Sequence, residues 1–457
     1  MTYGSRTGRA VVLAAVLGSG MTFLDGTVVN VALRTIGEDL GASLAELQWI
    51  TNGYLLSLSA LILLGGSLGD RFGRRRVFVL GTVVFATASV LCGLAPTPVL
   101  LIAARILQGV GAALLMPGSL AMIQGAFVVA DRGRAIGAWS GLAGISTAIG
   151  PFVGGWLIEY ASWRWIFLIN VPLAAVTIVV ALRSVPETFD PDAPRHFDIS
   201  GAALVSVARA GTSYALIEWG STAALVAAGL GVLGAIGFLV VEDRSSHPML
   251  PLGLFRDRTF SAANAMTLVV YAALGAVTFF VVLQLQTVAG YDALQAGIAM
   301  LPITFCMLFL ASRFGALGTR IGPRIPMTVG PLVMAVGATM LVPLGGDVRY
   351  VVDVLPGLTV FGLGLAVMVA PLTSTVLAAA PDDHAGIASG VSNAVARAGS
   401  LLAVAALPAA VGLTGASYAD PAVFDAGYQK AMVVCAVLLA LGAAVSWLLI
   451  RNPLRSA

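Results

Sequence analysis

Two oppositely charged side chains stand inside long apolar stretches, where a charge needs a partner or a polar cavity. Asp25 lies in the stretch 10–31 and Arg105 in the stretch 98–121. A charge at the centre of a bilayer costs roughly 3 kcal/mol or more, so such residues usually face a partner or a cavity. Burial disfavours an ionised carboxylate and a nearby arginine favours it, so a changing distance between the two makes the carboxylate take up or release a proton. The alternative is a static buried ion pair that sets helix register.

A glycine- and arginine-rich loop occurs twice in the chain. Residues 66–75 recur in altered form at 315–324, and each copy joins two apolar stretches. The first copy is predicted to be a gating loop formed by Gly66, Asp70, Arg71, Gly73, Arg74 and Arg75. The second copy has Thr319 in place of Asp70 and is predicted to be a topological anchor. The alternative for the first loop is a plain positive-inside cluster, which explains neither Asp70 nor the glycine spacing.

The composition is that of a membrane protein. Of 457 residues 58% are hydrophobic and only 10% are charged, whereas soluble domains have about 25% charged residues. The net charge of +3 makes nucleic acid an unexpected partner. Cys92, Cys306 and Cys435 lie in apolar stretches without metal-ligand spacing, and the three histidines are isolated. We therefore expect no cofactor, no metal and no enzymatic activity.

The apolar pattern predicts an all-α integral membrane protein with 14 transmembrane helices, each about 20 residues long. Positive residues favour the cytoplasmic side, and the external segments then hold only Arg34, Arg164, Arg349 and Lys430, with both termini cytoplasmic. The predicted spans are 10–31, 49–68, 77–95, 98–121, 135–158, 165–183, 199–219, 221–241, 262–286, 295–314, 326–344, 352–376, 390–413 and 429–450.

The repeated loop divides these spans into two six-helix halves related by pseudo-two-fold symmetry. We predict an N-terminal half at 1–183, a cytoplasmic linker at 184–198, two extra helices at 199–241 and a C-terminal half at 242–457. Gly109 and Gly111 with Pro117 are echoed by Gly362 and Gly364 with Pro371, which supports the duplication.

The stretch 135–158 contains the cluster Gly150-Pro151-x-x-Gly154-Gly155. Small residues allow helix backbones to approach closely, and the proline removes a helix hydrogen bond. We expect a conformational role, although ordinary helix packing would use similar glycines.

Other polar, aromatic and methionine side chains of the core spans could line a substrate cavity. Each alone is more often a packing residue, or a contact to lipid headgroups. The candidates are Asn30, Trp49, Tyr54, Met116, Trp139, Tyr271, Gln284 and Phe305.

These motifs together resemble the major facilitator superfamily, specifically its fourteen-helix drug:proton antiporter branch. The loop from Gly66 to Arg75 resembles the superfamily's signature, and Gly150 to Gly155 resembles its antiporter motif. The stretches Arg105-x-x-Gln108-Gly109-x-Gly111, Leu24 to Leu33 and Trp163 to Pro172 are similar to further motifs of the family or branch. Arg34 and Ser146 depart from the usual pattern.

The resemblance implies a proton-coupled antiporter that exports drugs or other small amphipathic molecules across the bacterial cytoplasmic membrane. Protons from outside would protonate Asp25, weaken its pairing with Arg105 and favour substrate release. The expected partners are a small-molecule substrate, protons and the lipid bilayer, with the protein acting as a monomer. The alternatives are a dedicated exporter of a single antibiotic or metabolite and a proton-coupled uptake carrier.

Overall fold

The computed structural model describes residues 1–189, 199–218, 220–245, 250–380, 385–413 and 420–452. Within these ranges every regular element is a helix. The first nine are α1 (Arg6–Leu40), α2 (Leu44–Phe72), α3 (Arg74–Gly93), α4 (Pro98–Ala126), α5 (Val129–Tyr160), α6 (Trp165–Leu168), α7 (Asn170–Ser184), α8 (Ile199–Ile217) and α9 (Thr222–Arg244).

The remaining elements follow the same pattern of long helices interrupted by short ones. They are η1 (Leu252–Arg256), α10 (Arg258–Thr287), α11 (Ala293–Ala299), α12 (Leu301–Ile321), α13 (Arg324–Met340), η2 (Tyr350–Val354), α14 (Leu355–Ala378), α15 (Ala385–Ala410) and α16 (Pro421–Leu449).

The helices confirm a multi-span membrane protein at a coarser level than the predicted count. Within the described ranges, ten helices are long and apolar enough to cross a membrane. There are eleven if α2, bent by 49° between Leu44–Ile62 and Leu64–Phe72, counts as one span. The fourteen predicted segments fall largely on helices, but α13 has only 17 residues, short of the roughly 20 that cross the hydrocarbon core. The number fourteen therefore stays a prediction.

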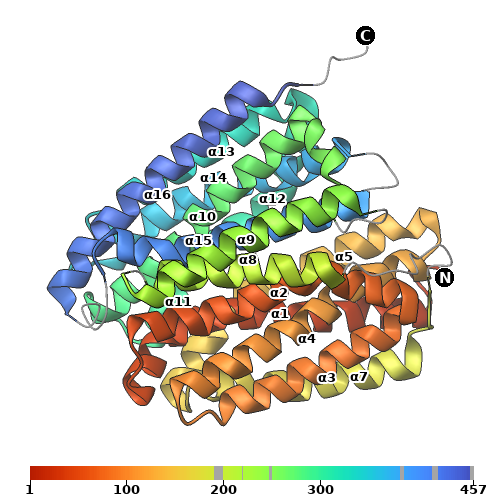
Figure 1. Cartoon of the computed structure of the whole chain (residues 1–457), viewed down its shortest axis with the longest axis horizontal. Helices are drawn as coiled ribbons and strands as arrows, with labels where there is room; N and C mark the ends of the chain where they lie inside the picture. Colours follow the sequence, from red (N-terminus) through yellow and green to blue (C-terminus); the bar gives the residue numbers. More distant parts are fainter. Residues whose placement is uncertain (190–198, 219, 246–249, 381–384, 414–419, 453–457) are drawn as a thin grey trace. The chain divides into compact units, whose positions relative to one another are not determined.

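The chain forms two compact units. One comprises Met1–Thr212 and Val226–Met249, and the other comprises Ser213–Leu225 and Leu250–Ala457. In the first unit α3 packs against α4 and α7, and in the second α13 packs against α14 and α16 (Figure 1).

Several helices begin with a side-chain cap from a residue close in sequence. Ser43 and Glu46 form a reciprocal capping box at the start of α2, and Thr97 accepts a hydrogen bond from the Leu100 N–H at the start of α4. Asp257 caps α10 in the same way. Such caps satisfy backbone donors that have no partner inside the helix.

Helix α4 approaches α2 so closely that only glycine fits at position 109. A Cβ on Gly109 would overlap the Ser57 hydroxyl and the Tyr54 carbonyl of α2, and would lie 3.1 Å from the Leu58 nitrogen. The corresponding Gly362 of α14 would place a Cβ 2.7 Å from the Ile303 Cα of α12. Both glycines thus allow backbone-to-backbone packing of the kind common between membrane helices.

Gly109→Ala is expected to destabilise the protein by roughly 1–3 kcal/mol because the added methyl group forces α2 away from α4. The matched control is Gly229→Ala in α9, where a Cβ meets no atom within 4 Å and alanine is intrinsically the better helix former. Thermal unfolding of the purified variants in detergent measures both effects. Equal melting temperatures for the two variants would contradict the close packing.

Candidate functional site

Asp25 of α1 and Arg105 of α4 meet in the interior of the amino-terminal unit. Their side chains are 0% and 1% exposed, and Arg105 Nη1 donates a hydrogen bond to Asp25 Oδ2. Arg105 Nε also donates to the Ile50 carbonyl at 3.1 Å. The guanidinium carbon lies 4.3 Å from the centre of the Tyr54 ring and 5.7 Å from that of Phe167. Two residues whose opposite charges in apolar stretches predicted a need for a partner are therefore in direct contact.

Three further polar side chains complete a network around this pair. Gln108, one turn after Arg105, accepts from Arg105 Nη1 at 2.6 Å and donates from Nε2 to Asp25 Oδ1 at 2.9 Å. The same Nε2 lies 2.7 Å from Ser89 Oγ of α3. Asn170, at the start of α7, donates from Nδ2 to Ser89 Oγ at 3.1 Å and to Asp25 Oδ1 at 3.4 Å. Gln108, Ser89 and Asn170 are all 0% exposed.

The network is arranged for an ionised carboxylate. Asp25 accepts hydrogen bonds from N–H groups of Arg105, Gln108 and Asn170. Removing a charge from water is tolerated when it is paired and fully hydrogen-bonded. Because α4 and α7 supply the partners of Asp25, a movement of either helix relative to α1 changes how well that charge is stabilised.

Helix α5 packs against α1. A Cβ on Gly150 would overlap the Thr27 hydroxyl, and one on Gly154 would overlap the Val28 side chain. Pro151 and Gly155 are buried. The predicted antiporter motif thus packs against the turn of α1 that follows Asp25, and its glycines set how near α5 can come to the charged pair.

The first copy of the repeated loop lies between α2 and α3. Gly73 has φ +108°, a conformation that other residues rarely adopt. Asp70 accepts from Arg74 Nε at 2.8 Å, and Arg74 Nη1 lies 3.4 Å from the Ala121 carbonyl of α4. Asp70 and Arg74 of the predicted gating loop thus pair inside their own unit, while Arg71 stacks on the neighbouring Phe72 ring at 5.3 Å.

Glu187, which follows α7, is an unpredicted partner of this loop. Its carboxylate accepts from the Arg75 backbone N–H at 2.9 Å and lies 3.5 Å from Arg75 Nε and 3.7 Å from Arg76 Nε. Arg75 Nη1 also donates to the Val185 carbonyl at 3.0 Å. The segment 185–188 is thereby held against the beginning of α3. We call this set of contacts the Glu187 clasp.

The second loop copy has a matching clasp with a neutral partner. Asn452, which follows α16, accepts from the Arg324 backbone N–H at 3.1 Å. Arg324 Nε donates to the Trp447 carbonyl at 2.9 Å, and its guanidinium lies 4.0 Å from the centre of the Trp447 ring. Gly322 has φ +85°. Arg75 and Arg324 occupy the same position in the two copies, and each binds the end of a helix that comes later in its own unit.

The predicted cavity residues of the amino-terminal unit differ in their burial and in their partners. Tyr54 joins the charged network and donates from its hydroxyl to the Thr22 carbonyl at 3.3 Å. Trp139 donates to Ser19 Oγ at 3.0 Å, and Met116 packs against the apolar core of the unit. Asn30 and Trp49 are half-buried.

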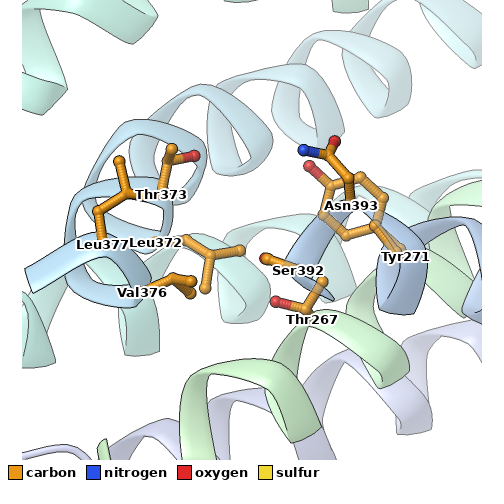
Figure 2. A pocket seen from close by; sticks show the side chains of 9 residues that line it. Thr267, Tyr271, Leu372, Thr373, Val376, Leu377, Ser392 and Asn393 are labelled. Atoms are coloured by element: carbon orange, nitrogen blue, oxygen red, sulfur yellow. The ribbon is translucent and has the colours of Figure 1, made fainter. Parts of the chain in front are cut away.

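The three cavity candidates of the second unit have different surroundings. Gln284 is buried and donates to the Leu344 carbonyl and to Asp425 Oδ1, both at 2.6 Å, while Phe305 is 51% exposed and stacks on Phe309. Tyr271 lines a pocket between α10, α14 and α15 (Figure 2). Hydroxyl, amide and aliphatic groups share that lining, which comprises Thr267, Tyr271, Leu372, Thr373, Val376, Leu377, Ser392, Asn393 and Ala396.

A bundle of apolar helices with a buried charge network defines a multi-span membrane protein whose polar interior is suited to moving a solute. Residues 15–404 match the Major Facilitator Superfamily, and the chain belongs to that family. It is a membrane transporter and not an enzyme.

Characterised relatives cover most of the chain. It is 36% identical to the tetracenomycin C resistance and export protein of Streptomyces glaucescens over 86% of this chain and 74% of that protein. It is 34% identical to the methylenomycin A resistance protein of Bacillus subtilis over 97% and 95%. The fold resembles the inward-open xylose transporter XylE from E. coli, with a TM-score of 0.66 and 15% identity over 98% of this chain and 97% of that one.

Several network residues were not singled out from the sequence, although signals for some exist. Gln108 and Asn170 lie inside the motifs 105–111 and 163–172, and their spacing from Arg105 and Pro172 could have identified them. Ser89 and Glu187 lie in no motif. Ser89 reaches the network because α3 packs against α4 and α7, and Glu187 reaches the separate clasp because the segment after α7 lies against the start of α3.

Glu187→Ala is expected to increase hydrogen exchange in the first turn of α3, because the Arg75 N–H loses its hydrogen-bond acceptor and two guanidinium groups lose a nearby negative charge. A hydrogen bond to a charged group contributes about 1.5–3 kcal/mol, so local exchange should rise more than tenfold. Exchange measured by mass spectrometry on residues 73–77 tests this. Glu187→Gln keeps an acceptor, as Asn452 does in the second copy, and should give a smaller increase. Unchanged protection in Glu187→Ala would contradict the clasp.

Proposed function

We propose that the protein is a proton-coupled antiporter of the fourteen-helix drug:proton branch that exports small amphipathic molecules from the bacterial cytoplasm. The observation that supports this proposal best is the buried Asp25–Arg105 pair with its complete shell of donors. Relatives named for antibiotic resistance and export support the outward direction. The proton is the only coupling ion in this proposal, and no cofactor takes part.

Proton coupling requires two states that bind the proton differently. In one state Asp25 is ionised and held by Arg105. In the other, a proton from outside neutralises Asp25, Arg105 loses its counter-charge, and the helices that supply the partners are released to move. Substrate binding from the cytoplasm would favour the ionised state, and protonation would favour substrate release and return. A local electrostatic change of this kind can bias a bistable helix bundle.

Alternating access would use two related halves, at 1–183 and 242–457, with the linker 184–198 and the extra helices 199–241 between them. The matching contacts of Arg75 and Arg324 support such a duplication. The first loop would act as a cytoplasmic latch through Asp70 and its arginines. The protein would act as a monomer in the cell membrane, with both termini cytoplasmic.

The pocket around Tyr271 is the proposed substrate contact in the second unit. Its lining offers hydroxyl and amide groups beside aliphatic ones, which suits a molecule that is partly apolar and carries hydrogen-bonding groups. Both relatives are named for a single antibiotic, so export of one compound is the alternative to multidrug export. A panel of growth-inhibition assays in an efflux-deficient host, with tetracenomycin C, methylenomycin A and ethidium among the compounds, distinguishes the two.

Asp25→Asn is expected to abolish substrate-driven proton movement in proteoliposomes, because the amide cannot carry the proton. The loss should exceed tenfold at every pH. Asp39→Asn is the matched control on the same helix, since Asp39 is 46% exposed and pairs with Arg164 near the end of α1. Intact proton exchange in Asp25→Asn would reject the coupling role.

Tyr271→Ala is expected to raise the KM for the exported compound about tenfold, because the pocket loses its aromatic wall and hydroxyl together. The pH dependence of transport should stay that of the unmodified protein, since Tyr271 is outside the Asp25 network. Initial rates in inside-out vesicles measure both quantities. An unchanged KM for every compound of the panel would remove this pocket from the substrate path.

A further inference from the structure

The two amide side chains beside Asp25 are held in different ways. Gln108 Oε1 accepts from Arg105 Nη1 at 2.6 Å and from the Cys92 thiol at 3.7 Å, so its orientation is locked by two donors. Asn170 Oδ1 is buried and has no hydrogen-bond donor among the residues that the structure describes. Only the Nδ2 end of Asn170 is engaged, by Ser89 and Asp25.

This difference becomes important when Asp25 gains a proton. An ionised carboxylate only accepts hydrogen bonds, whereas a protonated carboxyl also donates one and needs an acceptor. The neighbours of Asp25 Oδ1 are N–H donors from Gln108 and Asn170. A proton added to Oδ1 would therefore find donors there and no acceptor for its own hydrogen bond. Turning Gln108 over would break its bond to Arg105. Turning Asn170 over breaks no bond to its oxygen. It removes the two bonds that Nδ2 donates to Ser89 and Asp25 and places the oxygen near the same two groups, which can then donate to it.

We propose that Asn170 is the positioning residue that receives the hydrogen bond of protonated Asp25. Its amide turns over when Asp25 takes a proton from the external solution, so that Oδ1 accepts from the Asp25 carboxyl and from the Ser89 hydroxyl. When the proton leaves, the amide returns and Nδ2 again donates to the carboxylate. This inference rests on the proposed proton coupling and adds the residue that stabilises the protonated state.

The charged and titratable groups around Asp25 are compatible with this role. Arg105 faces it from α4, and the Cys92 thiol of α3 and the Tyr54 ring of α2 lie against the same guanidinium and amide. Helix α5 approaches the turn after Asp25 through Gly150 and Gly154. Asn170 is the contribution of α7, where it is the first residue of the helix.

The test is a pH titration of the purified protein in lipid, followed by infrared difference spectroscopy without substrate. The probe is the C=O stretch of protonated Asp25, identified as the band that Asp25→Asn removes. In Asn170→Leu, a substitution of similar volume, this band should titrate about one pH unit lower, because losing a buried acceptor weakens proton binding roughly tenfold. Substrate-driven proton exchange in proteoliposomes should shift in the same direction.

The sign of the shift separates the possible roles of Asn170. A residue that only donates to the carboxylate would, when removed, move the midpoint to higher pH, and a packing residue would not move it. Either result overturns the proposal. Gln108→Leu removes a locked donor and should move the midpoint upward, opposite to Asn170→Leu.

Asn264→Leu controls for the substitution itself. Asn264 is a buried amide of the other unit whose Nδ2 bonds the Phe260 carbonyl, and this variant should leave the band unchanged. Thermal unfolding confirms that each variant is folded. If Asp25→Asn removes no titrating band and leaves proton exchange intact, the proposed coupling itself fails. A band that shifts the wrong way in Asn170→Leu rejects only the role of Asn170.

Discussion

The burial of one guanidinium against one carboxylate constrains most of the amino-terminal unit. A charge of this kind loses several kcal/mol of hydration when it leaves water, so Arg105 must be paired, hydrogen-bonded and surrounded at once. Its partners come from α1, α2 and α4. These helices must pack closely for their side chains and carbonyls to reach Arg105. The absence of a side chain at Gly109 allows α2 and α4 to pack that closely. The close packing and the charge pair are therefore one structural requirement.

The same constraint explains why the neutral members of the network matter as much as the charged ones. The Asp25 carboxylate is shared among a guanidinium and two amides from α4 and α7. An arginine alone would stabilise a single protonation state. Amides can donate or accept, so one amide that changes its orientation can bond both the charged and the neutral form of a carboxyl group.

The sequence identifies the two buried charges but not the side chains that form hydrogen bonds with them. Asp25 and Arg105 were identifiable because a charge inside a long apolar stretch requires a partner or a polar cavity. Gln284 looked equally suited to a cavity, yet it is bonded to Asp425 and the Leu344 carbonyl. Helical periodicity gives the depth of a residue and does not give the neighbour it will meet. That neighbour is set by which helices pack together, which sequence patterns alone do not determine.

The contacts of the repeated loop could not be predicted from the sequence either, because they involve residues far away in the chain. From sequence, the copies differ by Asp70 against Thr319. In the structure, the last arginine of each copy holds the end of a later helix, and the partners of its backbone N–H are Glu187 in one unit and Asn452 in the other. The contact is common to both copies, and only the first is charged. The Glu187 side chain is 14% exposed and that of Arg75 is 27% exposed, so salt screens their attraction less than it would screen a pair on the surface. An electrostatic contact that salt weakens only in part therefore exists in the unit that also contains the buried charge pair.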